Sequence, residues 1–100
     1  MGFLSQEVAF RFDVYRVSTD IISIATMNAE GNLDAFRAVI SCEVAQLRFR
    51  YDGGDPNPTT GHILNPGDHL TLEGRGNIKA FRIIRAGPLD GQISVTLETI

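Results

Sequence analysis

The sequence has little cysteine, no tryptophan and no run of basic residues. Its single cysteine, Cys42, cannot form a disulfide within the chain, so we expect a reducing compartment and a fold held by packing alone. The nine Lys and Arg residues are scattered and the formal net charge is -3, which argues against nucleic-acid binding because that needs a basic patch. No apolar run approaches the ~18 residues of a membrane-spanning helix. We therefore expect a soluble protein with no nucleic-acid or membrane partner.

The length of 100 residues gives room for one domain and one core. Apolar residues make up 43% of the chain and charged residues 21%, as in an ordinary globular protein. We predict an N-terminal arm at residues 1–6 and a single domain at residues 7–100.

Apolar and polar residues alternate along most of the chain, which is typical of half-buried β-strands. In residues 34–44, the alternation of Phe36, Ala38, Ile40, Cys42 and Val44 predicts a strand, although the alanine content leaves a helix open. The pattern predicts strands at 7–15, 19–26, 34–44, 46–51, 62–64, 69–73, 77–85 and 92–98. Tyr51 is expected to point inward with its neighbours Leu47 and Phe49.

Seven or eight short strands between Gly/Pro turns, with no convincing helix, predict an all-β fold: an antiparallel β-sandwich or jelly-roll-like domain. Apolar residues also occur on the faces opposite this core, at Ala35, Val39, Ala80 and Ile84. They predict either a homo-oligomer or a second layer of the same chain. The residues expected to point inward are Val8, Phe10, Phe12, Leu47, Phe49, Leu70, Leu72, Phe81, Ile83, Ile93, Val95 and Leu97.

The stretch RFRYDGGDPNPTTGHILNPGDHLTLEG, residues 48–74, is the richest in turn residues. A calcium loop of the EF-hand type would need Glu at its twelfth position, which is Ile63 here, and a phosphate loop would need Lys where His62 stands. The two histidines, His62 and His69, lack the close spacing of a cupin metal site and have no cysteine nearby for a zinc site. We therefore predict no metal and no cofactor.

No catalytic motif stands out either. Ser41, His69 and Asp90 could be assembled into a triad on paper, but no serine lies in a nucleophile elbow. The chain is therefore expected not to be an enzyme.

Turn chemistry explains the same stretch with more residues. Asp52-Gly53 favours a tight turn, and Pro56 and Pro58 cannot donate to a strand ladder. Residues 65–68, NPGD, predict a type II turn, with Gly67 in the left-handed region. The stretch 52–62 is thus expected to form an ordered rim loop at one end of the sandwich.

A pattern of strand and turn residues runs through residues 40–97: Arg48, Arg50, Asp52, Gly53, Pro56, Thr59, Gly61, His62, Leu64, Gly67, Leu72, Gly74, Ile78, Phe81, Arg82 and Ile84. In this pattern the chain resembles small bacteriophage virion proteins. It departs from them at Pro56-Asn57, where the family tends to have Pro-Thr, so a contact made by that threonine is not carried over to this chain.

The resemblance implies a structural protein of the virion, assembled in the host cytoplasm. It favours a capsid decoration (cement) protein that bridges capsid subunits and forms a homo-oligomer, with a trimer as first expectation. Its partners would be the major capsid protein or another virion protein. The candidate partner-binding residues are Phe3 and Leu4 of the arm and Arg48, Arg50, Asp55, Asn57 and Thr59 of the rim loop and its strand.

Several alternatives remain open. The arm could be a frayed terminus and the two arginines solvated surface residues. A tail or head-completion role fits the same sequence. A carbohydrate-binding β-sandwich is the alternative of another class; its aromatic platform would be Tyr15, expected opposite the apolar face of the first strand, or Tyr51.

Overall fold

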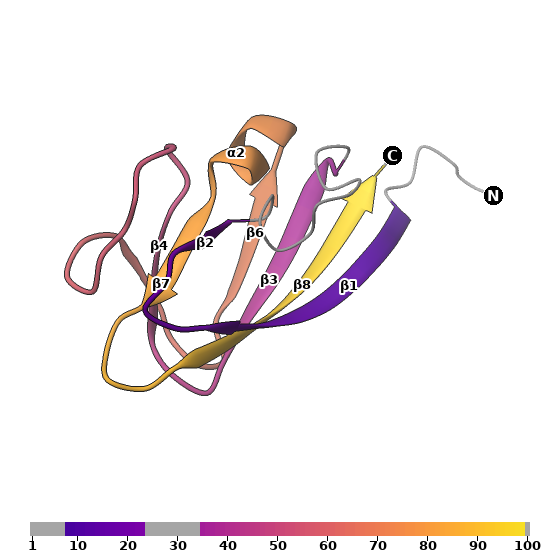
Figure 1. Cartoon of the computed structure of the whole chain (residues 1–100). Helices are drawn as coiled ribbons and strands as arrows, with labels where there is room; N and C mark the ends of the chain where they lie inside the picture. Colours follow the sequence, from indigo (N-terminus) through magenta and orange to yellow (C-terminus); the bar gives the residue numbers. More distant parts are fainter. Residues whose placement is uncertain (1–7, 24–34, 100) are drawn as a thin grey trace.

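The computed structural model describes residues 8–23 and 35–99 of the chain. Eight strands form two antiparallel sheets of four strands each (Figure 1). One sheet, here called sheet A, has the order β1-β8-β3-β6, and the other, sheet B, has the order β2-β7-β4-β5. The strands are β1 (Val8–Val17), β2 (Ile22–Ser23), β3 (Arg37–Glu43), β4 (Leu47–Arg50), β5 (His62–Leu64), β6 (His69–Glu73), β7 (Arg82–Arg85) and β8 (Gly91–Thr99).

The pairing follows a nested pattern. β1 pairs with β8, β2 with β7, β3 with β6 and β4 with β5, as in one long hairpin with its tip between β4 and β5. The additional pairs β3 with β8 and β4 with β7 roll that hairpin into two sheets. Eight strands in this double-sheet arrangement make a jelly roll, so the predicted all-β fold is confirmed.

The core lies between the two sheets and contains most of the residues predicted for it. Leu47, Leu72, Ile83 and Ile93 are at most 3% exposed, and Leu70 packs against this core while partly exposed. The side chains of Val8 and Phe10 lie outside the described part. The central part of the predicted strand 34–44 is also confirmed, because Arg37–Glu43 form β3. The other predicted core residues that are buried are Phe49, Phe81, Val95 and Leu97.

The prediction of which face of the first strand points into the core is wrong. Phe12 is 62% exposed and Val14 51%, whereas Val17 is fully buried and Tyr15 packs against the core. The register of β1 against β8 shifts between Ala9 and Arg11, as at a β-bulge. One extra residue in a strand moves every later side chain to the opposite face. Tyr15 is consequently half-buried and cannot be an exposed aromatic platform.

The predicted strand 77–85 is also wrong in its first half. Residues Arg75–Ala80 form a short helix, α2, which lies across one end of the molecule (Figure 1). The helix follows Gly74, whose φ of 91° suits glycine, and it buries Ile78. Phe81 then leads into β7. Burial of one apolar side chain against the open end of the sandwich thus outweighs the strand-like alternation of this segment.

The apolar residues predicted on the opposite faces are mostly covered by the chain itself. Ala35 is fully buried and Ile84 is 7% exposed, whereas Val39 and Ala80 are half-buried. Ala35 and Ile84 therefore give no reason of their own to expect a homo-oligomer. No helix among the described residues is long and apolar enough to span a membrane.

Candidate binding surfaces

The rim loop between β4 and β5 is ordered by its own hydrogen bonds. Gly53 has a φ of 87°, as the predicted Asp52-Gly53 turn requires. Asn57 Oδ1 accepts hydrogen bonds from the amide and the hydroxyl of Thr59, at 2.9 and 3.0 Å, and Asn57 pairs with Thr60 through both backbone amides. Pro56 is fully buried and anchors the loop. The candidate residues Asp55, Asn57 and Thr59 are exposed on this scaffold.

The two candidate arginines are engaged within the chain. The Arg50 guanidinium forms a two-point contact with the Asp52 carboxylate, at 3.0 and 2.6 Å, and donates to the Asp55 carbonyl. Arg48 donates to the Gly61 carbonyl at 2.9 Å, and its Nε is buried without a partner. Both arginines therefore hold the rim loop in place, a role that the sequence pattern alone did not indicate.

The contact between Arg50 and Asp52 predicts a pH dependence. The hydrogen bond from Arg50, followed by that from the Gly54 amide, lowers the pKa of Asp52 to about 2 from the ordinary 3.8. Because the folded-state pKa is depressed, the stabilisation is present above pH 3.8 and is lost as the pH falls towards 2. We expect the Asp52 carboxyl carbon to titrate near pH 2 by NMR. In Arg50→Gln it should titrate near 3.8, whereas Arg48→Gln should leave it unchanged; equal midpoints in all three proteins would contradict this geometry.

A pocket of about 290 Å³ opens beside the rim loop, lined by Arg50, Tyr51, Asp52 and His62. Tyr51 is 43% exposed, so the prediction that it points into the core is wrong. Its ring stacks on His62 at a centroid distance of 5.9 Å, and Phe49 lies behind both rings. The pocket combines an aromatic wall with an ion pair whose hydrogen-bonding groups are largely satisfied internally.

The histidines belong to different sheets. His62 is the first residue of β5 in sheet B and His69 the first of β6 in sheet A. Across residues 8–23 and 35–99, no three His, Cys, Asp or Glu side chains are grouped so as to hold a metal ion. Ser41 Oγ does lie 3.0 Å from His69 Nδ1, but Asp90 forms ion pairs with Arg16 and Arg85. Ser41, His69 and Asp90 are thus not joined by hydrogen bonds into one catalytic triad.

Cys42 is a buried, protonated thiol. It is 1% exposed, and Sγ contacts the carbonyl oxygens of Ala45 and Leu64 at 3.4 and 3.5 Å. Burial, with smaller effects from Asp68 and Glu43, raises the pKa of this thiol from 9.0 to about 11. Because the folded-state pKa is raised, the contribution of the neutral thiol to the stability of the folded protein is fully present below pH 9. This contribution is lost as the pH rises towards 11.

This burial predicts slow thiol chemistry. At pH 8 we expect Ellman's reagent to modify native Cys42 far more slowly than the urea-unfolded chain, because the thiolate is the nucleophile. The rate in native buffer should follow the rate of unfolding. Equally fast modification of native and unfolded protein would mean that the thiol is accessible.

The outer face of sheet A carries Phe12 and Val14, the two most exposed large apolar side chains on the strands whose burial the structure describes. Phe12 pairs with Thr96, Thr96 with Val39 and Val39 with Thr71, which makes one row across all four strands. Directly paired residues share a face. The next row consists of Val14, Ser94, Ser41 and His69. These two rows are called the sheet A patch below.

Ion pairs flank the sheet A patch on one side. Arg37 forms a 2.7 Å contact with Glu98 and a longer one, 3.9 Å, with Glu73. On the other side the Gln92 amide donates to the Glu43 carboxylate at 2.6 Å, in the row that begins with Arg16. Phe12 and Val14, on the edge strand β1, are the exposed apolar members of the patch, and polar side chains surround them, as at the rim of a protein–protein contact surface. The sequence pattern missed this surface because it assigned Phe12 to the core.

The candidate arm residues Phe3 and Leu4 lie outside the described residues. No protein-family model matches the chain, and a search of curated proteins finds no match. The resemblance to phage virion proteins therefore remains a prediction.

Proposed function

We propose that the chain is a non-enzymatic structural protein of a bacteriophage particle, most specifically a capsid decoration protein that bridges subunits of the shell. The observation that carries this proposal is the sheet A patch, in which Phe12 and Val14 remain 62% and 51% exposed. Apolar side chains gathered on one face of a soluble domain mark an interaction surface. The fold alone does not carry the proposal, because jelly rolls serve many unrelated functions.

The position of β1 supports an assembly role. β1 is the longest strand, with ten residues, and it lies at an edge of sheet A. An edge strand presents unpaired backbone groups that a strand of another chain can pair with. Two features limit unspecific pairing along this edge. One is the charged Asp13, on the same inward side as Tyr15, and the other is the bulge near Ala9.

In this proposal, self-association uses the sheet A patch and shell binding uses the rim loop. In the proposed homo-oligomer, a trimer by analogy with decoration proteins at three-fold positions, the patch of one copy meets a neighbouring copy. The rim loop then faces a shell subunit, where Asp55, Asn57 and Thr59 offer polar groups. Arg48 and Arg50 contribute by holding the loop rather than by direct pairing.

The copy number of the chain in purified particles tests the proposal. Quantitative mass spectrometry should find hundreds of copies, in step with the major capsid protein. A handful of copies would favour the tail or head-completion alternative, and absence from particles would overturn a virion role. Particles assembled with Phe12→Ser should retain fewer copies than those with Ile63→Ser, a matched change at a side chain that is 45% exposed in sheet B.

A carbohydrate-binding module is the second candidate, supported by the pocket at Tyr51. The exposed Tyr51 ring offers a stacking surface, and Asp52 and His62 line the same pocket. A glycan array with the native chain and with Tyr51→Ala separates the two functions. Glycan binding that is lost in the variant would favour the carbohydrate function, and no binding would favour the structural one.

A further inference from the structure

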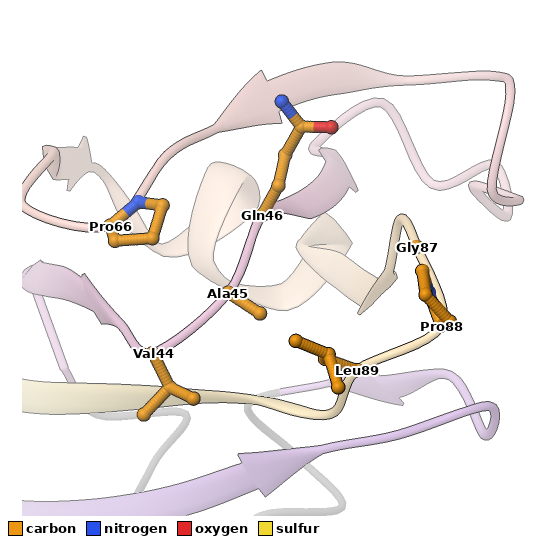
Figure 2. Close-up of a pocket in the computed structure, with 7 residues that line it drawn as sticks. All are labelled: Val44, Ala45, Gln46, Pro66, Gly87, Pro88 and Leu89. Atoms are coloured by element: carbon orange, nitrogen blue, oxygen red, sulfur yellow. The ribbon is translucent and has the colours of Figure 1, made fainter.

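The end of the sandwich opposite the rim loop carries a second pocket, of about 320 Å³. Three turns meet there: the β3–β4 turn with Val44 and Ala45, the β5–β6 turn with Pro66, and the β7–β8 turn with Pro88 and Leu89 (Figure 2). Leu89 and Ala45 face one another across it. This volume is at the lower end of the roughly 300–1,000 Å³ that is usual for ligand pockets.

The walls of this pocket are apolar and remain open to solvent. Val44 is 68% exposed and Leu89 65%, the two highest values among the exposed large apolar residues of the described chain. Val44 also has a φ of 79°, which is strained for a β-branched residue. Gln46 and Gly87 complete the lining, so none of the seven lining residues carries a charge.

The pocket is preformed because the three turns are joined to each other. The side-chain amide of Gln46 donates from Nε2 to Asn65 Oδ1 at 2.9 Å. The backbone amide of Ala86 donates to the backbone carbonyl of Gln46 at 3.1 Å. The Gly67 amide donates to the Cys42 carbonyl at 2.9 Å. A rigid, exposed apolar pocket lowers the entropy cost of binding a side chain of a partner.

Asp90 secures the β7–β8 turn. Its two carboxylate oxygens each contact an arginine, Arg16 at the end of β1 and Arg85 at the end of β7, and these contacts lower the Asp90 pKa. Both arginines are therefore paired with this carboxylate. The turn that presents Leu89 is held at its base.

Two carboxylates, Glu43 and Asp68, belong to the turns that form the pocket. Glu43 directly precedes Val44, and Asp68 closes the turn that contains Pro66. Both carboxylates contribute to the raised pKa of Cys42, whose thiol contacts the Ala45 carbonyl. Within the described residues, Glu43 and Asp68 accept hydrogen bonds from Gln92 and the Asn65 amide but form no ion pair. The pocket is thus an apolar hollow with an acidic border.

We propose that this pocket, the turn pocket, binds a segment of a partner protein that presents an apolar anchor side chain flanked by lysine or arginine. The anchor packs between Leu89, Ala45 and Val44, and the basic flank faces Glu43 and Asp68. The turn pocket shares no lining residue with the sheet A patch, although Glu43 borders both, so this site does not depend on the proposed assembly role.

Three blocked peptides test the site by NMR titration of the ¹⁵N-labelled full chain. Acetyl-Lys-Leu-Lys-amide should shift the amide signals of Ala45, Gly87 and Leu89 in a saturable manner. Acetyl-Glu-Leu-Glu-amide should bind several-fold more weakly because its charges face Glu43 and Asp68. Acetyl-Lys-Ser-Lys-amide, which lacks the anchor, should cause no saturable shift.

Three variants complete the test. Leu89→Ser should abolish the response to acetyl-Lys-Leu-Lys-amide, and Ile63→Ser, at an exposed apolar position of sheet B outside the pocket, should retain it. Glu43→Gln should reduce the difference between the lysine and glutamate peptides. Absent or equal responses to the three peptides, or an unchanged response in Leu89→Ser, would overturn the proposal. Concentration-dependent shifts of the same signals without peptide would assign the pocket to a second copy instead and would also overturn it.

Discussion

Phe81→Ala is expected to lower the free energy of unfolding by about 3–5 kcal/mol, the range for loss of a buried phenylalanine. Phe81 is fully buried between α2 and β7, and its ring lies 5.9 Å from that of Phe49. The truncation leaves a cavity that a rigid sandwich cannot close by a small shift. Urea unfolding followed by circular dichroism measures the loss.

Phe12→Ala is the matched control. At concentrations low enough for the chain to be monomeric, Phe12 is 62% exposed, so we expect the removal of the same atoms to change the free energy of unfolding by no more than about 0.5 kcal/mol. The contrast also tests the bulge in β1, since without the bulge Phe12 would lie in the core. Similar losses in both variants would contradict the observed register.

Gly91→Ala is expected to destabilise the fold by about 1–3 kcal/mol through overpacking. A Cβ at this position would lie 2.5 Å from Leu47 Cδ2 and 3.2 Å from the Ala45 carbonyl oxygen. Leu47 is fully buried and cannot move aside. The double variant Gly91→Ala/Leu47→Val should lose less stability than the two single changes added together, because the shorter side chain removes the clash.

Gly87→Ala is expected to have the opposite effect on the free energy of unfolding. A Cβ there meets no atom within 4 Å, so the loss of backbone freedom in the unfolded chain should stabilise the protein by about 0.4–1 kcal/mol. Both proteins are compared by the midpoint and slope of urea unfolding. A stabilising Gly91→Ala would mean that β4 and β8 approach less closely than observed.

The sequence predicts the strands best where alternation and turn chemistry agree. Ile93, Val95 and Leu97 alternate with polar residues, and all three are buried in β8. The turn at residues 65–68 follows from Pro66 and Gly67: Gly67 has a φ of 94°, and the Asp68 amide donates to the Asn65 carbonyl. In both places the local preference of the chain matches its tertiary environment.

The first strand shows why the rest could not be predicted. Apolar residues occupy both of its faces, with Phe12 and Val14 on one and Tyr15 and Val17 on the other. The choice between them depends on a bulge whose position is set by pairing with β8, which is more than seventy residues away in the sequence. Local periodicity contains no information about that partner. Phe12 of the sheet A patch is consequently predicted in the core.

The candidate sites were predictable to different degrees. The rim loop follows from its turn residues, but the attachment of Arg50 to Asp52 depends on Gly54, where a Cβ would collide with the guanidinium group. The exposure of Leu89 can be predicted from the sequence, because an apolar residue between Pro88 and Asp90 lies in a turn. Its meeting with Val44 depends on the jelly-roll pairing and could not be read from the sequence.

The central claim is that Phe12 and Val14 form a contact surface between chains, and light scattering after size-exclusion chromatography tests it most directly. The account predicts a native mass that is a multiple of the 11.0 kDa chain, three-fold for a trimer, at micromolar concentration. Phe12→Ser/Val14→Ser should shift the mass to that of one chain while its circular dichroism spectrum stays native. A native protein that remains monomeric at every concentration, or a double variant with unchanged mass, would contradict the account.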